Sequence, residues 1–465
     1  MPLSRRAALT AFAAAPFLRA AGTLRAGAAT ANISPALGSS LAGNMTDHVC
    51  ANVHDDLLVR CAALESGSSR ALLMTIDSCM VPRTILDRVR ARIASANSID
   101  PAAILMSSTH THSAPPAMHL FQSQPDPAYL ATLETRMVDA AKMAFFRLRP
   151  ARFGAASGQE PALVNNRRFY MKEGTIPADP FGNRNDKVQM NPPLQSPDLL
   201  RPAGPIDPEH AVLAAIGEDG RPIWIYGNYA LHYAGYNPST DASADYFGAW
   251  ARRIEHALGG DCVAMISNGC SGNINAIAYA RVYPTRSSYA FIDRVAGVLS
   301  LETLRVLRTI EFTNDVSIAA AMSEVDLGVR RPSTAETQAA VKLVGEQPGN
   351  DYKDRSLIYA RETIYMSKYP ESIRVPVQGL RIGSVGFGTF PGETFVEHGL
   401  AVKQASRHKT TVTVSIANDA CGYIPTAEGF DQGGYETWRA KSAYVERDAG
   451  TKLTAAVRAL VEKVY

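Results

Sequence analysis

Two histidines follow an apolar stretch in a pattern suited to binding a metal ion. Residues 102–106 read AAILM and residues 107–116 read SSTHTHSAPP. The apolar residues predict a buried strand, which the two prolines prevent from continuing. Alternate residues of an extended chain point the same way, so His110 and His112 can face one pocket. A polar loop with solvated histidines is the alternative, so further ligands must occur at comparable positions.

Three other segments place candidate ligands beside apolar stretches. His232 follows the apolar residues 223–230, Glu393 follows expected strands at 373–377, 380–382 and 385–387, and Tyr423 follows one at 411–416. Two imidazoles and a carboxylate leave zinc an open position for water or a substrate oxygen, and a phenol can complete the shell. On the residues alone, Tyr423 reads equally well as a core aromatic, and Glu393 as an acid at a helix N-terminus.

Composition excludes several classes of protein. The chain has 465 residues, 46% hydrophobic and 20% charged, with a net charge of +3. These values are typical of a globular protein with a large core. A nucleic-acid-binding protein would need a concentrated basic face, so no nucleic-acid partner is expected. The six cysteines include no Cys-x-x-Cys pair, which leaves their disulfide state open.

The order of apolar segments predicts an α/β (α+β) fold, a mixed β-sheet core with flanking helices. Strands are expected at 57–64, 71–76 and 102–106. A helix expected at 84–96 lies between the last two of them, which indicates a βαβ unit. A hairpin is expected at 211–216 and 223–230, and further helices at 126–147, from Phe395 to Ser406 and at 448–465. Pro376 predicts an edge strand at 373–377, and residues 173–207 predict a long surface excursion.

The N-terminus has the composition of an export signal. Arg5 and Arg6 precede an alanine-rich apolar run that is too short to span a bilayer, and residues 25–29 read RAGAA. This pattern is typical of a twin-arginine signal. We expect residues 1–29 to be removed, residues 30–465 to form one catalytic domain, and the protein to be periplasmic or secreted. No transmembrane segment is expected.

Four short blocks resemble the N-terminal catalytic domain of the neutral/alkaline non-lysosomal ceramidases. They are THTHSAP at 109–115, NYALH at 228–232, PGET at 391–394 and YIPT at 423–426. The resemblance implies that zinc is held by His110, His232, Glu393 and Tyr423. It also implies that His112, Tyr435 and the substrate-facing Arg167 line the site. The family's C-terminal sandwich domain has no counterpart here.

One segment departs from the family pattern at the nucleophile. The family's serine segment resembles SNxGDVSPN, and a gapless match to residues 267–275 places Asn273 at the serine position. Either Ser271, two residues earlier, attacks, or a water activated at the metal does. An amide cannot be a nucleophile, so Asn273 would be a positioning or oxyanion-type donor. This departure and the missing domain put ceramide specificity in doubt.

The expected function is hydrolysis of an amide bond in a small-molecule or lipid substrate, including one presented at a membrane surface. His112 and Tyr435 would assist proton transfer or hold the oxyanion, and Arg167 would orient the substrate. Two alternatives remain at this stage. One is a hydrolase of esters or other acyl groups that depends on Ser271, and the other is a metal-holding binding protein without catalysis.

Overall fold

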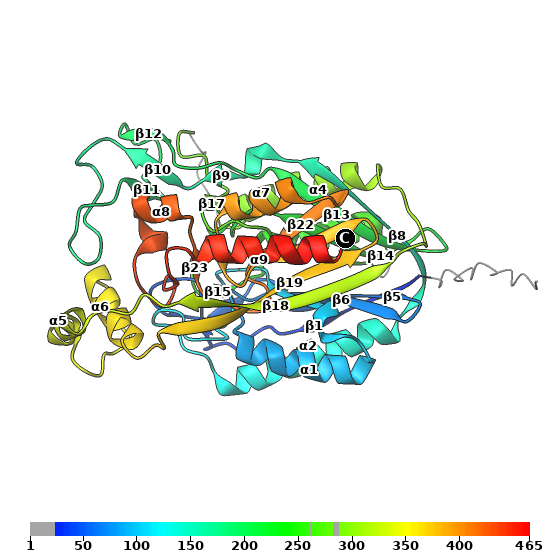
Figure 1. Ribbon diagram of the computed structural model, residues 1–465, viewed down its shortest axis with the longest axis horizontal. Coiled ribbons are helices and arrows are strands. Elements are labelled where there is room, and N and C mark those ends of the chain that lie inside the picture. Colours follow the sequence, from blue (N-terminus) through cyan, green and yellow to red (C-terminus); the bar gives the residue numbers. More distant parts are fainter. Residues whose placement is uncertain (1–23, 260–261, 282–287) are drawn as a thin grey trace, which may run out of the picture.

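Two mixed β-sheets pack against each other, and helices cover their outer faces (Figure 1). The structure is a computed structural model that describes residues 24–259, 262–281 and 288–465. The larger sheet has the strand order β16 (Val263–Asn268), β14 (Pro222–Tyr229), β13 (Glu209–Gly217), β8 (Arg149–Gln159), β1 (Arg25–Asn32), β5 (Leu58–Ser66), β6 (Ser69–Ile76), β7 (Ile104–Ser108). The smaller has the order β18 (Ile318–Gly328), β19 (Ser372–Ile382), β20 (Val385–Thr389), β22 (Thr410–Val414).

The helices on the outer faces pack in three pairs. The pairs are α1 (Arg83–Asn97) with α2 (Pro127–Phe146), α3 (Asp245–Leu258) with α4 (Ala290–Leu307), and α7 (Val396–Ala405) with α9 (Ala449–Lys463). The first two pairs cover the larger sheet, and the third covers the smaller one. The paired helices α5 (Thr334–Val344) and α6 (Arg355–Met366) lie at one end of the molecule (Figure 1). The expected α/β class is therefore confirmed.

Strands of the larger sheet are apolar on both faces because both faces are buried. On β13, Val212 and Ala214 pack in the cluster under α3 and α4, whereas Leu213 and Ala215 pack against the smaller sheet. A strand buried on both sides needs continuous apolar sequence rather than alternation. Among the described residues, no helix has the length and apolar content that a membrane span requires.

The predicted βαβ unit is confirmed. β6 and β7 are parallel neighbours, paired from Leu72↔Ile104 to Ile76↔Ser108, and α1 connects them. Their carboxyl ends therefore lie side by side, and the backbone N–H of His110 donates to the carbonyl of Ser78 (3.0 Å). The loops that follow the two strands are fixed against each other at this edge.

The two halves of the larger sheet meet at a narrow junction. β1 and β8 pair only at Arg25↔Pro150 and Ala26↔Arg149. The pairings along the strand order make β14 and β16 run opposite to β6 and β7. In a flat sheet their carboxyl ends would lie at opposite edges. The sheet bends enough for β16 to contact β7, which brings these ends together.

Two expectations for loops and edges need correction. Pro376 lies on β19, which is an interior strand between β18 and β20. β20 pairs with β19 only from Gly379 to Ile382. Pro376 precedes this paired stretch, so no backbone N–H is needed there for a hydrogen bond to β20. The excursion at 173–207 is not structureless, because β11 (Val188–Met190) and β12 (Leu199–Pro202) flank β10 (Arg168–Met171) in a small sheet.

All six cysteines are buried and free.

The N-terminal boundary expected at residues 29 and 30 falls inside β1. The arginine pair and the alanine-rich run lie outside the described residues, so the signal itself stays a prediction. Leu24, Ala26 and Ala29 are at most 1% exposed, and β1 pairs with β5 from Arg25 to Asn32. The expectation that residues up to 28 pack against nothing is therefore wrong for residues 24–28. Cleavage that preserves this strand must occur before Leu24.

We expect a chain that starts at Leu24 to fold and one that starts at Thr30 to fail, because the shorter chain loses most of β1 from the sheet interior. Thermal unfolding followed by circular dichroism measures this, with a cooperative transition expected only for the longer chain. Sequencing the N-terminus of exported protein should place the mature end at or before Leu24. Equal melting temperatures for the two chains would contradict the prediction.

Candidate metal centre

Three buried side chains from distant parts of the chain meet at one point. His110 follows β7, His232 follows β14, and Glu393 begins β21 (Glu393–Thr394). His110 Nε2 lies 3.1 Å from His232 Nε2 and 3.3 Å from Glu393 Oε2, and His232 Nε2 lies 3.5 Å from the same oxygen. Each side chain is at most 4% exposed. The structure thus brings together three of the four expected ligands through their donor atoms.

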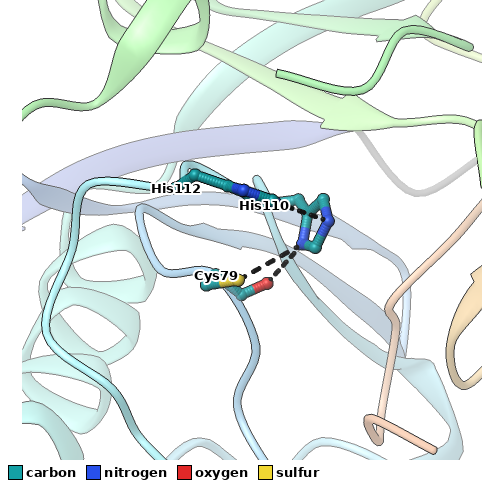
Figure 2. A group of neighbouring side chains, drawn as sticks. All are labelled: Cys79, His110 and His112. Carbon is teal, nitrogen blue, oxygen red and sulfur yellow. Dashed lines mark hydrogen bonds between the residues drawn. The ribbon is translucent and has the colours of Figure 1, made fainter. Parts of the chain in front are cut away.

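Backbone carbonyls fix the tautomers of both imidazoles. His110 Nδ1 lies 2.8 Å from the carbonyl oxygen of Cys79, as Figure 2 shows, and His232 Nδ1 lies 3.0 Å from that of Ser271. A carbonyl oxygen only accepts, so each Nδ1 must carry the proton. Each Nε2 then presents a lone pair toward the centre, which is the arrangement that metal-binding histidines adopt.

The centre therefore holds three hydrogen-bond acceptors that face one another. Glu393 Oε2 is buried and has no hydrogen-bond partner among the described residues. Acceptors at such distances repel unless a cation lies between them. Donor atoms at ~2.0 to 2.2 Å from zinc in tetrahedral geometry lie about 3.3 to 3.6 Å apart, close to the observed separations. The residues present fit a metal ion of this kind.

The pKa values agree with a centre that needs a positive charge. Burial, assisted by the charges of Arg167 and the neighbouring histidines, lowers the pKa of His232 well below its usual value. Burial also acts to lower the pKa of His110, but Cys79 and Glu393 outweigh it and raise that pKa to about 10. A proton on His110 and a metal ion thus compete for the same position.

Local backbone conformation directs these side chains. His110 has a φ of 73°, a left-handed conformation that is uncommon outside glycine and concentrates at functional sites. The loop after His232 is held by Asp245, whose carboxylate accepts the N–H groups of Ala234 (2.9 Å) and Gly235 (2.8 Å). Asp245 is the first residue of α3, so this loop is tied to the start of that helix.

Tyr423, the fourth expected ligand, lies next to Glu393. It is on β23 (Tyr423–Ile424), which pairs with β21 in parallel register, with Glu393 opposite Tyr423. Its hydroxyl accepts a hydrogen bond from Arg167 Nη2 (3.0 Å). Burial raises the pKa of Tyr423 well above its usual value. The phenol is therefore protonated unless a cation binds its oxygen.

A buried carboxylate that sequence reasoning missed holds Arg167 in place. Glu436 accepts from Arg167 Nε (3.1 Å) and from Arg168 Nη1 (2.8 Å), and it is fully buried. One carboxylate therefore serves two guanidinium groups, which leaves net positive charge beside the centre. In the sequence, only its position directly after Tyr435 could have indicated that Glu436 lies at the site.

His112 and Tyr435 border the centre without being part of the triad. His112 Nε2 lies 3.1 Å from His110 Nε2, and its ring stacks on Tyr233. Burial is the largest cause that lowers the pKa of His112, so the imidazole is neutral at pH 7. Tyr435 packs edge-to-face against Tyr423, and burial raises its pKa, which keeps its hydroxyl a proton donor.

Cys79 is a further neighbour that the sequence did not suggest. Its Sγ lies 3.7 Å from His110 Nδ1, and Cys79, His110 and His112 also form a group close enough to hold an ion (Figure 2). His110 belongs to both groups, and its Nδ1 already faces the Cys79 carbonyl. We therefore assign the ion to the side of His110 that carries Nε2.

The two candidates for nucleophile and oxyanion donor have side chains engaged elsewhere. Ser271 Oγ donates to Asn268 Oδ1 (2.8 Å), while its carbonyl accepts from His232. Asn273 Nδ2 donates to Glu397 Oε2 (2.9 Å), and its Oδ1 accepts from the N–H of Val396 (2.9 Å). Asn273 thus anchors the start of α7, and the structure does not bring its amide into the centre.

We expect Glu393→Gln and His232→Ala to abolish retention of a metal, because each removes one of three facing acceptors. Elemental analysis by mass spectrometry after gel filtration should find about one ion per chain in the wild type. His408→Ala is the matched control, because His408 contacts the Val461 carbonyl away from the centre. Wild-type metal content in the Glu393→Gln variant would show that the ion binds elsewhere.

Comparisons with known proteins support the fold. No protein-family model matches the sequence, and no curated protein matches it. Among solved structures, the neutral ceramidase from Pseudomonas aeruginosa aligns with a TM-score of 0.71 at 16% identity, covering 95% of this chain and 75% of that chain. A structure described as ceramidase complexed with C2 aligns with a TM-score of 0.72 at 16% identity, covering 95% and 74%. The chain therefore has a neutral ceramidase-like fold.

Proposed function

We propose that this chain is an exported, zinc-dependent hydrolase of an acyl amide bond, of the neutral ceramidase kind. The observation that carries the proposal is the triad of buried acceptors, His110 Nε2, His232 Nε2 and Glu393 Oε2, in a neutral ceramidase-like fold. These three residues would hold the zinc, and Tyr423 lies beside Glu393 to complete the shell. Bound zinc polarises a carbonyl and lowers the pKa of water, the chemistry that amide hydrolysis needs.

The surrounding residues would divide the remaining work. Arg167 is held by Glu436 and by the Gly272 carbonyl (2.7 Å), so it is a rigid donor that orients a substrate oxygen. His112 presents a neutral imidazole beside His110 and can accept a proton at Nε2. The Tyr435 hydroxyl has no hydrogen-bond partner among the described residues that would compete with a substrate. It can donate a proton to a developing oxyanion or leaving amine.

The geometry favours water over Ser271 as the nucleophile. A serine nucleophile needs a base within hydrogen-bond reach of its hydroxyl. Ser271 Oγ instead donates to the Asn268 amide oxygen, which is not a base at neutral pH. Asn273, at the position of the family's serine, has no nucleophilic atom.

Export follows from the sequence and is part of the same proposal. The arginine pair and the alanine-rich run precede the first described residue, Leu24. A twin-arginine route carries folded proteins, so the zinc could be bound before export. A periplasmic or secreted enzyme of this kind would meet amide substrates outside the cytoplasm.

A panel of acyl amides and acyl esters, combined with metal analysis of the mature protein, tests the proposal. Amide hydrolysis that is lost on chelation and restored by zinc supports it. Ester hydrolysis that is abolished by a serine-directed phosphonate would indicate the Ser271-dependent alternative. Retained zinc without turnover of any substrate would indicate a metal-holding binding protein.

We expect Ser271→Ala to retain most of the wild-type kcat/KM, because the substitution leaves the three acceptors in place. Loss of a serine nucleophile would instead reduce the rate on the order of 10⁴-fold or more. Steady-state kinetics on the best amide of the panel distinguishes the two. A covalent acyl adduct trapped on Ser271 would overturn the preference for water and leave the metal centre unaffected.

A further inference from the structure

A cavity borders the metal centre on the side of Arg167 and Tyr233. Its volume is about 370 Å³. Tyr233 stacks on His112 with 3.8 Å between ring centroids, and Arg167 donates to Tyr423. Both residues therefore contact the centre on one side and line the cavity on the other. A substrate bound at the centre would extend one of its two halves into this space.

Hydrogen bonds fix which polar atoms face the cavity at its exposed rim. Asn275 Oδ1 accepts the N–H of Ile277 (2.9 Å), so Asn275 Nδ2 must be the donor toward Asn191 Oδ1 (2.9 Å). The Tyr279 hydroxyl also donates to Asn191 Oδ1 (2.6 Å). Reversing the amide of Asn191 would place its NH₂ group against the NH₂ group of Asn275, so Asn191 Oδ1 must face Asn275. Its Nδ2, with two N–H groups, is left for the cavity.

Arg167 supplies a second donor to the same cavity. Its side chain is only 5% exposed, and Nε and Nη2 are occupied by Glu436, Gly272 and Tyr423. Nη1 makes no hydrogen bond with the described part of the chain. The backbone N–H of Asn191 donates to the Arg167 carbonyl (2.9 Å), and Asn191 has a left-handed φ of 48°. The backbones of Arg167 and Asn191 are therefore in direct contact, and both residues line the cavity.

The charge of the cavity selects the kind of group that it binds. None of the described residues that line it is acidic, and Arg167 is the one charged residue among them. A neutral hydroxyl both donates and accepts, whereas a carboxylate only accepts and carries the complementary charge. A lining that holds a guanidinium and the Asn191 amide donor, and no acidic side chain, fits the carboxylate better.

Tyr435 borders a second, smaller cavity of about 130 Å³. Its lining is mainly apolar, with Met45, Ile176, Met190 and Trp438, and it also includes the charged residues Asp186 and Arg355. An apolar cavity of similar size, ~150 Å³, holds one benzene molecule. The second half of the substrate is therefore a compact apolar group. A long unbranched chain would extend beyond this space.

We propose that the substrate is an amide with a carboxylate on one half, bound by Arg167 and Asn191, and a compact apolar group on the other half. This inference rests on the proposed amide hydrolase activity, because it assigns the two halves of that substrate. It makes Asn191 a specificity-determining residue for the carboxylate.

Matched substrates test the proposal with the zinc-loaded mature protein. N-Hexanoylglycine is compared with N-hexanoylethanolamine, and the reversed amide N-hexylsuccinamate with N-hexyl-4-hydroxybutanamide, so that each pair differs in the carboxylate alone. We expect kcat/KM to be about tenfold or more higher for the carboxylate in at least one pair, because a hydrogen bond to a charged group is worth that factor. Asn191→Leu should remove most of this preference. Gln195→Leu, four residues away on the same exposed loop and outside the lining, should retain it.

A binding measurement separates this inference from the proposed activity. N-Hexylsulfonylglycine and N-hexylsulfonylaminoethanol carry the same halves on a sulfonamide that an amide hydrolase does not cleave. Calorimetric titration of the wild type should give at least about tenfold tighter binding of the carboxylate, which Asn191→Leu abolishes. Equal binding of the two compounds, or an unchanged preference in Asn191→Leu, would overturn the carboxylate site whether or not the protein hydrolyses amides. Retained preference without turnover would count against the hydrolase alone.

Discussion

Repulsion among three buried acceptors is the constraint on which the site depends. His110, His232 and Glu393 face one another at 3.1 to 3.5 Å, and the carbonyls of Cys79 and Ser271 prevent either imidazole from turning its N–H inward. A metal ion or a proton on His110 relieves this repulsion, and with neither present the arrangement costs free energy that the fold must supply from elsewhere. The fold can supply it because β7 and β14 are strands of the larger sheet and Glu393 is paired with Tyr423 between β21 and β23. A metal ion bound there would convert the repulsion into stability and would couple metal binding to folding.

Arg167 and Glu436, which lie beside the three acceptors, explain how a rigid centre can still select a substrate. Arg167 connects Tyr423 beside the acceptors to a cavity on the opposite side, and Glu436 keeps its guanidinium in one orientation. A charge held in this way loses little conformational entropy when it binds a ligand. The same residue can therefore support chemistry at the centre and recognition in the cavity. The side chain of Asn273 secures the start of α7, which leaves it outside the centre.

The fold resembles the neutral ceramidases, whereas the rest of the site points toward a different substrate. A likeness at 16% identity fixes the arrangement of strands and the position of the centre. The cavities depend on the less regular segments around it, such as the region of 168–202, where β10, β11 and β12 form a small sheet. Loops of this kind vary most readily between proteins of one fold, so specificity changes there without disturbing the centre.

Much of the fold and most of the ligand candidates could be predicted from local patterns. The apolar run before His110, the βαβ unit and the hairpin that leads to His232 follow from periodicity, because burial acts on neighbouring residues in a regular way. The set His110, His232, Glu393 and Tyr423 came from the resemblance of short motifs to the neutral ceramidases, since the residues alone left Glu393 and Tyr423 open. The boundary at residue 29 was misplaced because RAGAA reads equally well as a cleavage site and as a buried strand.

The tertiary structure decided what depends on residues far apart in the chain. β7 and β14 run in opposite directions along the sheet, so the meeting of His110 with His232 requires the bend at the two-residue junction of β1 and β8. The pairing of Glu436 with Arg167 and Arg168 spans more than 260 residues, and the donor-lined cavity exists only after three loops come together. No local pattern encodes such contacts, because each side chain's partner is set by how the whole sheet twists and packs.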